Sequence, residues 1–153
     1  MAEKHHPLIP GELLSYMRGQ PWAIEASVAR DGAPQAAVIA VAITDLYELL
    51  FDTVTQPRKH QNLLKNPRVA FVIGWEHDRT VQYEGLAELP AEAELPEVQA
   101  TYFNRYPDGP TRLTGPGLVY WRVRPAWIRY SNLSVNPPIV QEWDATAIAD
   151  WLR

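Results

Sequence analysis

The chain contains no cysteine. This absence excludes disulfide bonds, metal sites built on thiolates and enzymes that use a cysteine nucleophile. No apolar run approaches 18 residues, and no charged-apolar-small secretory signal opens the sequence. We therefore expect a cytoplasmic protein that does not insert into a membrane.

Several common catalytic motifs are also missing. The sequence has no His-Glu-x-x-His pair, no glycine-rich phosphate loop and no nucleophile elbow around a serine. His5 and His6 lie near the N-terminus, and His60 and His77 are isolated, so we expect surface roles for the last two and no metal site. The formal net charge of −4 disfavours a protein that holds nucleic acid by bulk electrostatics.

The composition is that of one globular domain spanning residues 1–153. The 14 prolines are about twice the usual share, which favours many short elements. Strand patterns cover residues 22–30, 34–44, 49–53, 69–75, 80–89, 118–123 and 127–131. Helix patterns cover residues 10–19, 57–66 and 91–106, and a C-terminal helix follows Asp144. This order predicts a mainly β fold, a small closed or partly closed antiparallel barrel.

Two strands carry distinctive patterns. In the 22–30 strand, Trp22, Ile24, Ala26 and Val28 share one face. In the 80–89 strand, Gly85 interrupts the alternation and indicates a bulge or a close approach.

The 34–44 strand has eight apolar residues in succession, at positions 36–43. An antiparallel strand with one wet face should alternate, so we expect both faces of this strand to be covered. One face is bulky, with Ile39, Val41 and Ile43, and fits a barrel core. On the other face Ala36, Ala40 and Ala42 flank Val38. That small face suits a subunit interface, a ring-shaped ligand or cover by the protein's own helices.

The segment from Phe51 to Lys59 places two cations at a predicted helix start. Pro57 is suited to the first helical position, so Arg58 and Lys59 fall in the first turn. That end of a helix carries a partial positive charge and unpaired N–H groups, which disfavours cations. Together with the hydroxyls of Thr53 and Thr55, these groups form a phosphate cradle. The alternative is a solvated Arg-Lys pair on a surface helix.

The same segment resembles the pyridoxamine 5′-phosphate oxidase-like flavoprotein superfamily. The resemblance lies in residues 50–53 (Leu-Phe-Asp-Thr), 58–59 (Arg-Lys) and 66–69 (Asn-Pro-Arg-Val), with weaker matches at 79–81, 84–85 and 121–125. It covers about residues 22–131. It implies a six-stranded antiparallel split β-barrel of Greek-key topology with a few flanking helices. It also implies a homodimer with FMN at each subunit interface.

The resemblance further implies which residues contact FMN. Arg58 and Lys59 would hold the phosphate, with Thr53 and the backbone around Asp52 nearby. The isoalloxazine would lie on the strand residues Ala37, Val38, Ile39 and Ala40. Thr80 or Gln82 would come from the opposite subunit.

The sequence departs from the family's oxidases at their substrate site. Those enzymes carry an arginine and a lysine where this chain has Ala37 and Ala42, and the lysine helps grip the substrate phosphate. The family's flavin-contacting glutamine aligns with Thr80 and its tryptophan with Ser131, and its C-terminal Arg-His motif has no counterpart. We therefore expect the FMN phosphate site to be kept and efficient pyridoxamine 5′-phosphate oxidation to be lost.

These observations give three hypotheses for function. The first is an FMN-dependent oxidoreductase acting on an undefined small molecule, in which no side chain need act as acid or base. The second is a protein that binds flavin, deazaflavin or haem without turnover. The third, an oligosaccharide- or nucleic-acid-binding barrel, is disfavoured by the acidic charge and by the placement of the cations.

A basic and aromatic cluster near the C-terminus leaves alternatives open. Its members are Arg122, Arg124, Arg129, Tyr120, Trp127 and Tyr130. It would contact an anionic substrate, contact a partner subunit, or form a solvated strand face.

Overall fold

The computed structural model describes residues 6–54, 57–112 and 117–153. The strands are β1 Ala23–Val28, β2 Pro34–Ile39, β3 Ala42–Ile43, β4 Leu49–Val54, β5 Arg68–Ile73, β6 Arg79–Glu88, β7 Leu118–Asn132 and β8 Ile139–Asp144. The α-helices are α1 Pro10–Arg18, α2 Arg58–Lys65, α3 Leu95–Arg105, α4 Gly109–Arg112 and α5 Ala145–Trp151. Two 3₁₀ turns, Glu76–Asp78 and Glu92–Glu94, complete the described elements.

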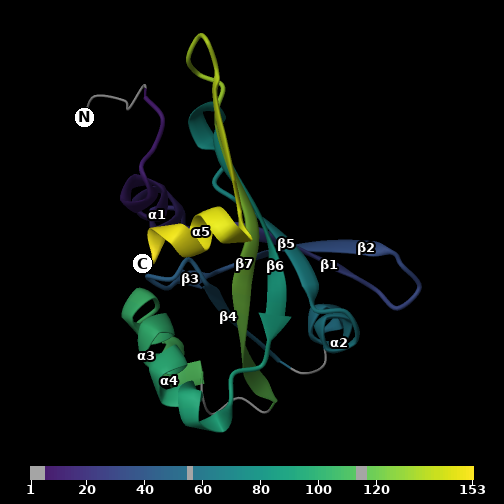
Figure 1. Cartoon of the computed structure of the whole chain (residues 1–153). Coiled ribbons are helices and arrows are strands. Elements are labelled where there is room, and N and C mark those ends of the chain that lie inside the picture. The colour runs from purple at the N-terminus through teal and green to yellow at the C-terminus, as the bar shows by residue number, and fades with distance from the viewer. Residues whose placement is uncertain (1–5, 55–56, 113–116) are drawn as a thin grey trace.

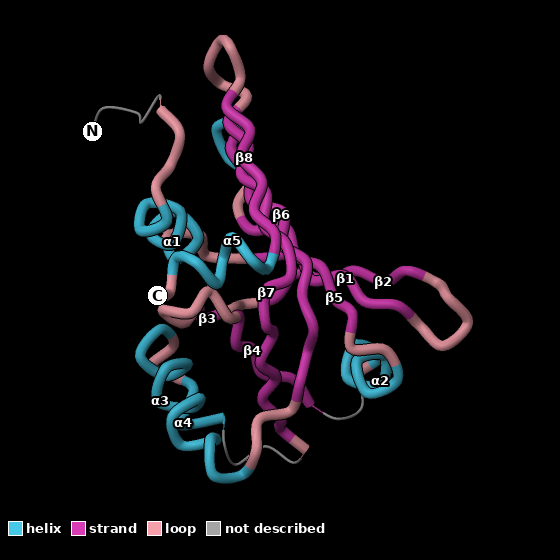
Figure 2. The backbone as a smooth tube through the Cα atoms, in the orientation of Figure 1, coloured by secondary structure: helices cyan, strands magenta, loops and turns pink. Residues whose placement is uncertain are grey.

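The strands form one antiparallel sheet in the order β2-β1-β5-β6-β7-β4-β3, with β8 paired to β7. The sheet curls into a half-barrel flanked by helices, which confirms the predicted mainly β split-barrel class (Figure 1). Two hairpins, β1–β2 and β7–β8, extend beyond the curled part (Figure 2). None of the described helices is long and apolar enough to cross a bilayer.

The sheet has eight strands where six were expected. The predicted 34–44 strand breaks after Ile39, because β2 pairs with β1 whereas β3 pairs with β4. The chain changes neighbours at this point, a choice that no local pattern records. In addition, Ile139–Asp144 pairs with β7 and adds a strand that the sequence reasoning did not predict.

The predicted strands 118–123 and 127–131 form a single strand, β7, which runs through Pro125. Pro125 pairs with Gly85 of β6, next to a register shift between Glu84 and Gly85. A Cβ atom at Gly85 would overlap the Arg124 carbonyl oxygen and the Val123 side chain. The predicted bulge or close approach at Gly85 is therefore confirmed, and the irregularity accommodates the proline.

Two hydrophobic clusters hold the fold together. The larger cluster fills the inside of the curl and includes Phe51, Phe71, Tyr83, Trp121 and Ile128. The smaller cluster lies on the other face of the sheet, where α3 covers β3, β4 and β7. Its buried members are Ala42, Leu50, Val98, Tyr102 and Tyr120.

The apolar 34–44 segment is only partly covered within one chain. Ile39, Val41 and Ile43 are buried in the main core, as predicted for the bulky face. On the small face, α3 covers Ala42, but Ala36 is exposed and Val38 is 61% exposed. The protein's own helices therefore do not cover the β2 half of this face.

Candidate cofactor site at the start of helix α2

Helix α2 begins where the sequence reasoning expected cations at a helix start. Pro57 immediately precedes the helix instead of occupying its first turn, and the helix begins at Arg58. The first turn contains no acidic residue, and no side chain of a described residue caps it. Arg58 is exposed and Lys59 is half-buried. Thr55, the other hydroxyl predicted for the cradle, lies outside the described residues.

Helix α2 is fixed to the β1–β2 hairpin by buried polar contacts. The Asn62 side-chain amide donates to Ser27 Oγ at 3.1 Å and to Gln35 Oε1 at 2.7 Å. Leu63, one position further, is buried in the main core. These contacts place α2 on the inner, core-facing side of the sheet and hold its first turn beside β1.

His60 lies on the buried face of α2, and the predicted surface role is wrong. It is 5% exposed, because it occupies the same helix face as the buried Leu63. The Trp121 Nε1–H donates to His60 Nδ1 at 3.1 Å. Desolvation lowers the pKa of His60, so the ring is neutral at pH 7. With Nδ1 accepting a hydrogen bond, the ring proton is on Nε2, and that nitrogen is not available as a metal ligand.

Asp52 and Thr53 lie at the end of β4 that leads to α2. Thr53 is 7% exposed and its hydroxyl donates to the Val54 carbonyl at 3.4 Å. Asp52 points to the opposite face, where Oδ1 accepts a hydrogen bond from the Tyr102 hydroxyl of α3 at 3.0 Å. Strand alternation therefore leaves Thr53 and the backbone of Asp52 on the α2 side.

The four residues predicted to lie under a flavin ring do not share one face. Ala37 is paired with Glu25 and Ile39 with Ala23, on the inner side of the sheet. Val38 is paired with Ile24 and projects from the outer side. Ala40 lies at the break between β2 and β3 and is half-buried. A planar ligand on this segment would therefore contact mainly its backbone.

Thr80 and Gln82 are on the outer face of β6. Residues paired across neighbouring strands lie on the same face of the sheet. Gln82 pairs with Val72 of β5, which pairs with Ile24 of β1, and Ile24 pairs with the exposed Val38 of β2. Gln82 is exposed, and Thr80 Oγ1 is buried without a hydrogen-bond partner in the described part of the chain. Within one chain, Thr80 and Gln82 thus lie on the opposite face from α2 and cannot join Arg58 and Lys59 in one site.

Glu25, in the middle of β1, is a site residue that the sequence reasoning missed. Its face of β1, with Ala23 and Ser27, points to the core, whereas the more apolar face with Ile24, Ala26 and Val28 is only half-buried. Glu25 is 1% exposed, and its Oε1 has no hydrogen-bond partner among the described residues. Burial raises the pKa of Glu25, while the charge of Lys59 and a hydrogen bond with Ser27 act to lower it.

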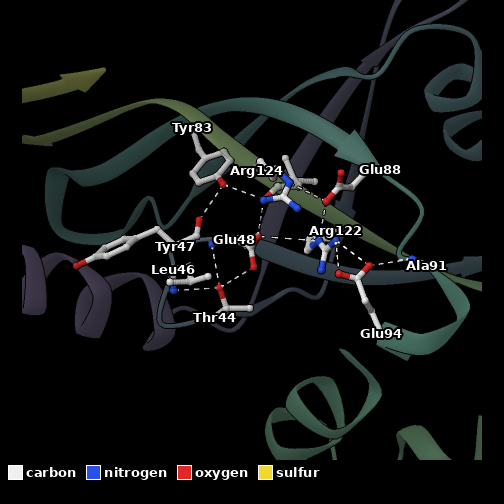
Figure 3. Close-up of polar contacts among 11 residues, drawn as sticks. Thr44, Leu46, Tyr47, Glu48, Tyr83, Glu88, Ala91, Glu94, Arg122 and Arg124 are labelled. Atoms are coloured by element: carbon white, nitrogen blue, oxygen red, sulfur yellow. Dashed lines mark hydrogen bonds and ion pairs between the residues drawn. The ribbon is translucent and has the colours of Figure 1, made fainter. Parts of the chain in front are cut away.

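Two arginines of the predicted basic and aromatic cluster, Arg122 and Arg124, form ion pairs with nearby glutamates (Figure 3). Arg122 Nε lies 2.7 Å from Glu88 Oε1, and its NH2 lies 3.1 Å from Glu94 Oε2. Arg124 Nε also contacts Glu88, at 2.8 Å. Both guanidinium groups lie within 4 Å of Glu48, at 3.9 and 3.7 Å. These arginines are neutralised inside the chain, which weakens them as a grip for an anionic substrate.

The remaining members of that cluster lie elsewhere. Arg129 forms an ion pair with Glu142 of β8 at 3.2 Å, and Tyr130 is buried in the main core. The paired arginines Arg122 and Arg124 line a cavity of about 880 Å³ between α3 and the turn after β3. Its walls carry both acidic and basic side chains, and none of them comes from α2.

The chain matches known proteins over most of its length. The family model for "Pyridoxamine 5'-phosphate oxidase" matches residues 9–132. A pyridoxine/pyridoxamine 5′-phosphate oxidase from Chromobacterium violaceum is 37% identical over 83 residues, which are 54% of this chain and 37% of that protein. In the curated relatives that match, the aligned segments span between 33% and 38% of the relatives' own length.

Solved structures support the fold. A haem-binding protein from Mycobacterium smegmatis superposes with a TM-score of 0.79 at 17% identity, covering 95% of this chain and 61% of that chain. A pyridoxamine 5′-phosphate oxidase-related, FMN-binding protein from Nostoc punctiforme gives a TM-score of 0.71 at 14% identity, covering 90% of this chain and 91% of that chain. At such low identity these likenesses establish the split-barrel fold alone.

Proposed function

Because this chain belongs to the pyridoxamine 5′-phosphate oxidase-like FMN-binding split-barrel superfamily, we propose that it binds FMN with the phosphate at the start of α2. The observation that carries the proposal is the first turn of that helix, with Arg58, Lys59 and no acidic residue. Such a turn is destabilised by its own charges unless an anion lies in front of it.

The groups present fit a phosphate. The Arg58 guanidinium offers a fork of donors, Lys59 adds an ammonium, and the start of the helix adds backbone N–H groups. Thr53 lies at the adjoining end of β4. When bound, FMN supplies electron transfer, and the protein supplies binding and orientation.

We propose further that a second copy of the chain completes the site. The outer face of β2 leaves Ala36 and Val38 uncovered within one chain. Thr80 and Gln82 lie on that same outer face, away from their own α2. A homodimer packed through this face brings Thr80 and Gln82 of one copy toward the cofactor held by the other. Sedimentation at micromolar concentration tests this, since a clean species of 17.4 kDa would contradict it.

The activity we propose is an FMN-dependent oxidoreductase acting on a small molecule. We expect no efficient oxidation of pyridoxamine 5′-phosphate, because Ala37 and Ala42 offer no hydrogen bond to a phosphate. Arg122 and Arg124 are already paired with glutamates and do not provide a substitute. The second candidate is a carrier of flavin, deazaflavin or haem without turnover. For haem, His60 of α2 has its Nδ1 occupied by a hydrogen bond from Trp121.

The decisive experiment compares FMN with riboflavin. Replacing Arg58 and Lys59 together by alanine removes charge-assisted contacts of about 1.5–3 kcal/mol each. FMN affinity, followed by quenching of flavin fluorescence, should fall far more than riboflavin affinity. Equal weakening of both ligands would place the phosphate elsewhere. The absorbance spectrum of the purified protein separates flavin from haem, and reoxidation of the reduced protein by candidate acceptors separates an enzyme from a carrier.

A further inference from the structure

Glu25 is a buried carboxyl group beside the proposed phosphate site. It lies in the centre of β1, between Ala37 of β2 and Phe71 of β5 in the register. Helix α2 covers this inner side of β1, and its Asn62 is engaged with Ser27 and Gln35 instead of Glu25. The charge of Lys59, in the first turn of α2, acts on Glu25 and lowers the pKa that burial raises.

We propose that Glu25 takes up a proton from solvent when a phosphate binds at the start of α2. This inference rests on the proposed function. The charge of Lys59 and a hydrogen bond with Ser27 favour the ionised carboxylate, whose Oε1 has no hydrogen-bond partner among the described residues. A phosphate dianion in front of Lys59 claims the same ammonium and adds negative charge nearby. Protonation of Glu25 removes one negative charge and leaves Lys59 to the phosphate.

The nearby charge of Lys59 distinguishes Glu25 from an inert buried acid. Burial alone favours the protonated carboxyl group, whether or not a ligand is bound. Lys59 instead favours the ionised form in the free protein, because its charge lowers the pKa that burial raises. The same lysine belongs to the first turn that faces the ligand. Ligand binding and Glu25 protonation therefore share one cation, which makes them interdependent.

Isothermal titration of the 153-residue chain with FMN tests the inference. Titrations between pH 5 and pH 8, in buffers of different ionisation enthalpy, give the number of protons taken up for each FMN bound. The matched variant is Glu25→Gln, which keeps the shape and removes the titrating group. Bound FMN releases its own phosphate proton below about pH 6, so the difference between wild type and variant isolates Glu25.

We expect the wild type to take up to one more proton per FMN than the Glu25→Gln variant. Riboflavin, which lacks the phosphate, should show no such difference. The variant should bind FMN more tightly above the pH of maximal uptake, by tenfold for each pKa unit that binding adds to Glu25. Equal proton counts in wild type and variant at every pH would overturn the inference.

Infrared difference spectroscopy of the wild type provides a second measurement that needs no variant. Addition of FMN at the pH of maximal uptake should produce the carbonyl band of a protonated buried carboxyl group. FMN binding without that band overturns this inference and leaves the proposed function standing. Failure of FMN to bind at all overturns both.

Discussion

Replacing Glu25 by glutamine should stabilise the protein at neutral pH and not at acidic pH. Burial raises the pKa of Glu25 in the folded state above that in the unfolded chain. At a pH below the pKa of Glu25 in the unfolded chain, both the folded and the unfolded state hold the proton, and the carboxyl group carries no charge penalty. As the pH rises from the pKa of Glu25 in the unfolded chain toward its pKa in the folded protein, the folded state binds more protons than the unfolded state. The free energy of unfolding therefore falls. At a pH above the pKa of Glu25 in the folded protein, the cost of burying the charged carboxylate is complete.

The magnitude follows from burial and from the missing partner. Each pKa unit of difference between the folded and unfolded states corresponds to about 1.4 kcal/mol. A buried polar group without its partner costs about 1–3 kcal/mol, and more when charged. Lys59 offsets part of this cost. We therefore expect the Glu25→Gln variant to be more stable than the wild type by about 1–3 kcal/mol at pH 8, with a gain that shrinks toward pH 4.

Urea denaturation of the ligand-free protein at a series of pH values measures this difference. The matched control is Glu84→Gln, because Glu84 is exposed on the outer face of β6. The control should leave the pH dependence of stability unchanged. A glutamine amide can itself meet a poor environment at position 25, but that cost does not vary with pH. A stability difference that is the same at pH 4 and pH 8 would therefore refute the reasoning.

The remaining predictions concern the fold, the interface and His60. Gly85→Ala should destabilise by about 2–4 kcal/mol in urea denaturation, because the added methyl overlaps the β7 backbone; a loss below about 0.5 kcal/mol would contradict the close approach. Val38→Lys should shift sedimentation toward the monomer, because it places a charge on the exposed face of β2, and the variant should remain folded in a thermal melt. An unchanged dimer would show that β2 lies outside the interface. His60→Ala should cost about 2–4 kcal/mol, because it opens a cavity and leaves Trp121 Nε1 unpaired; a neutral result would place that ring outside the core.

Local signals explain what the sequence revealed about α2. Pro57 and Pro67 bound a segment long enough for two helical turns, and the structure has the helix at Arg58–Lys65. These residues act through their own backbone geometry, so the prediction needed no tertiary information. The same holds for Gly85, where the missing side chain breaks an otherwise regular alternation.

Non-local pairing explains what the sequence reasoning missed in the sheet. Residues 36–43 look like one strand because every side chain is apolar. The break at 40–41 arises because β1 and β4, distant in the chain, each bind one half of the segment. Strand β8 likewise forms only because β7 extends far enough to accept it.

The burial of His60 and Glu25 was not predicted, because side-chain polarity does not show here which face of the helix or strand points to the core. In β1 the more apolar alternation is the outer one, and the inner one carries Glu25 and Ser27. Helix α2 meets that polar inner face with Asn62, which satisfies Ser27 and Gln35. Assigning the more apolar face of β1 to the core, as the usual pattern suggests, would therefore exchange its inner and outer faces.

That inversion bears on function. A strand that buries its polar face gives up hydrophobic stabilisation, and natural proteins carry such conflicts mainly where a site requires them. Here the Asn62 amide donates to Ser27 Oγ and to Gln35 Oε1, whereas Glu25 Oε1 has no partner among the described residues. Glu25 is also the carboxyl group whose titration feels Lys59, in the first turn of α2. The buried carboxyl group of Glu25, with its unpartnered oxygen among the described residues, thus adjoins the proposed phosphate site. In the Glu25→Gln variant, a gain in stability should therefore coincide with the loss of proton uptake on FMN binding.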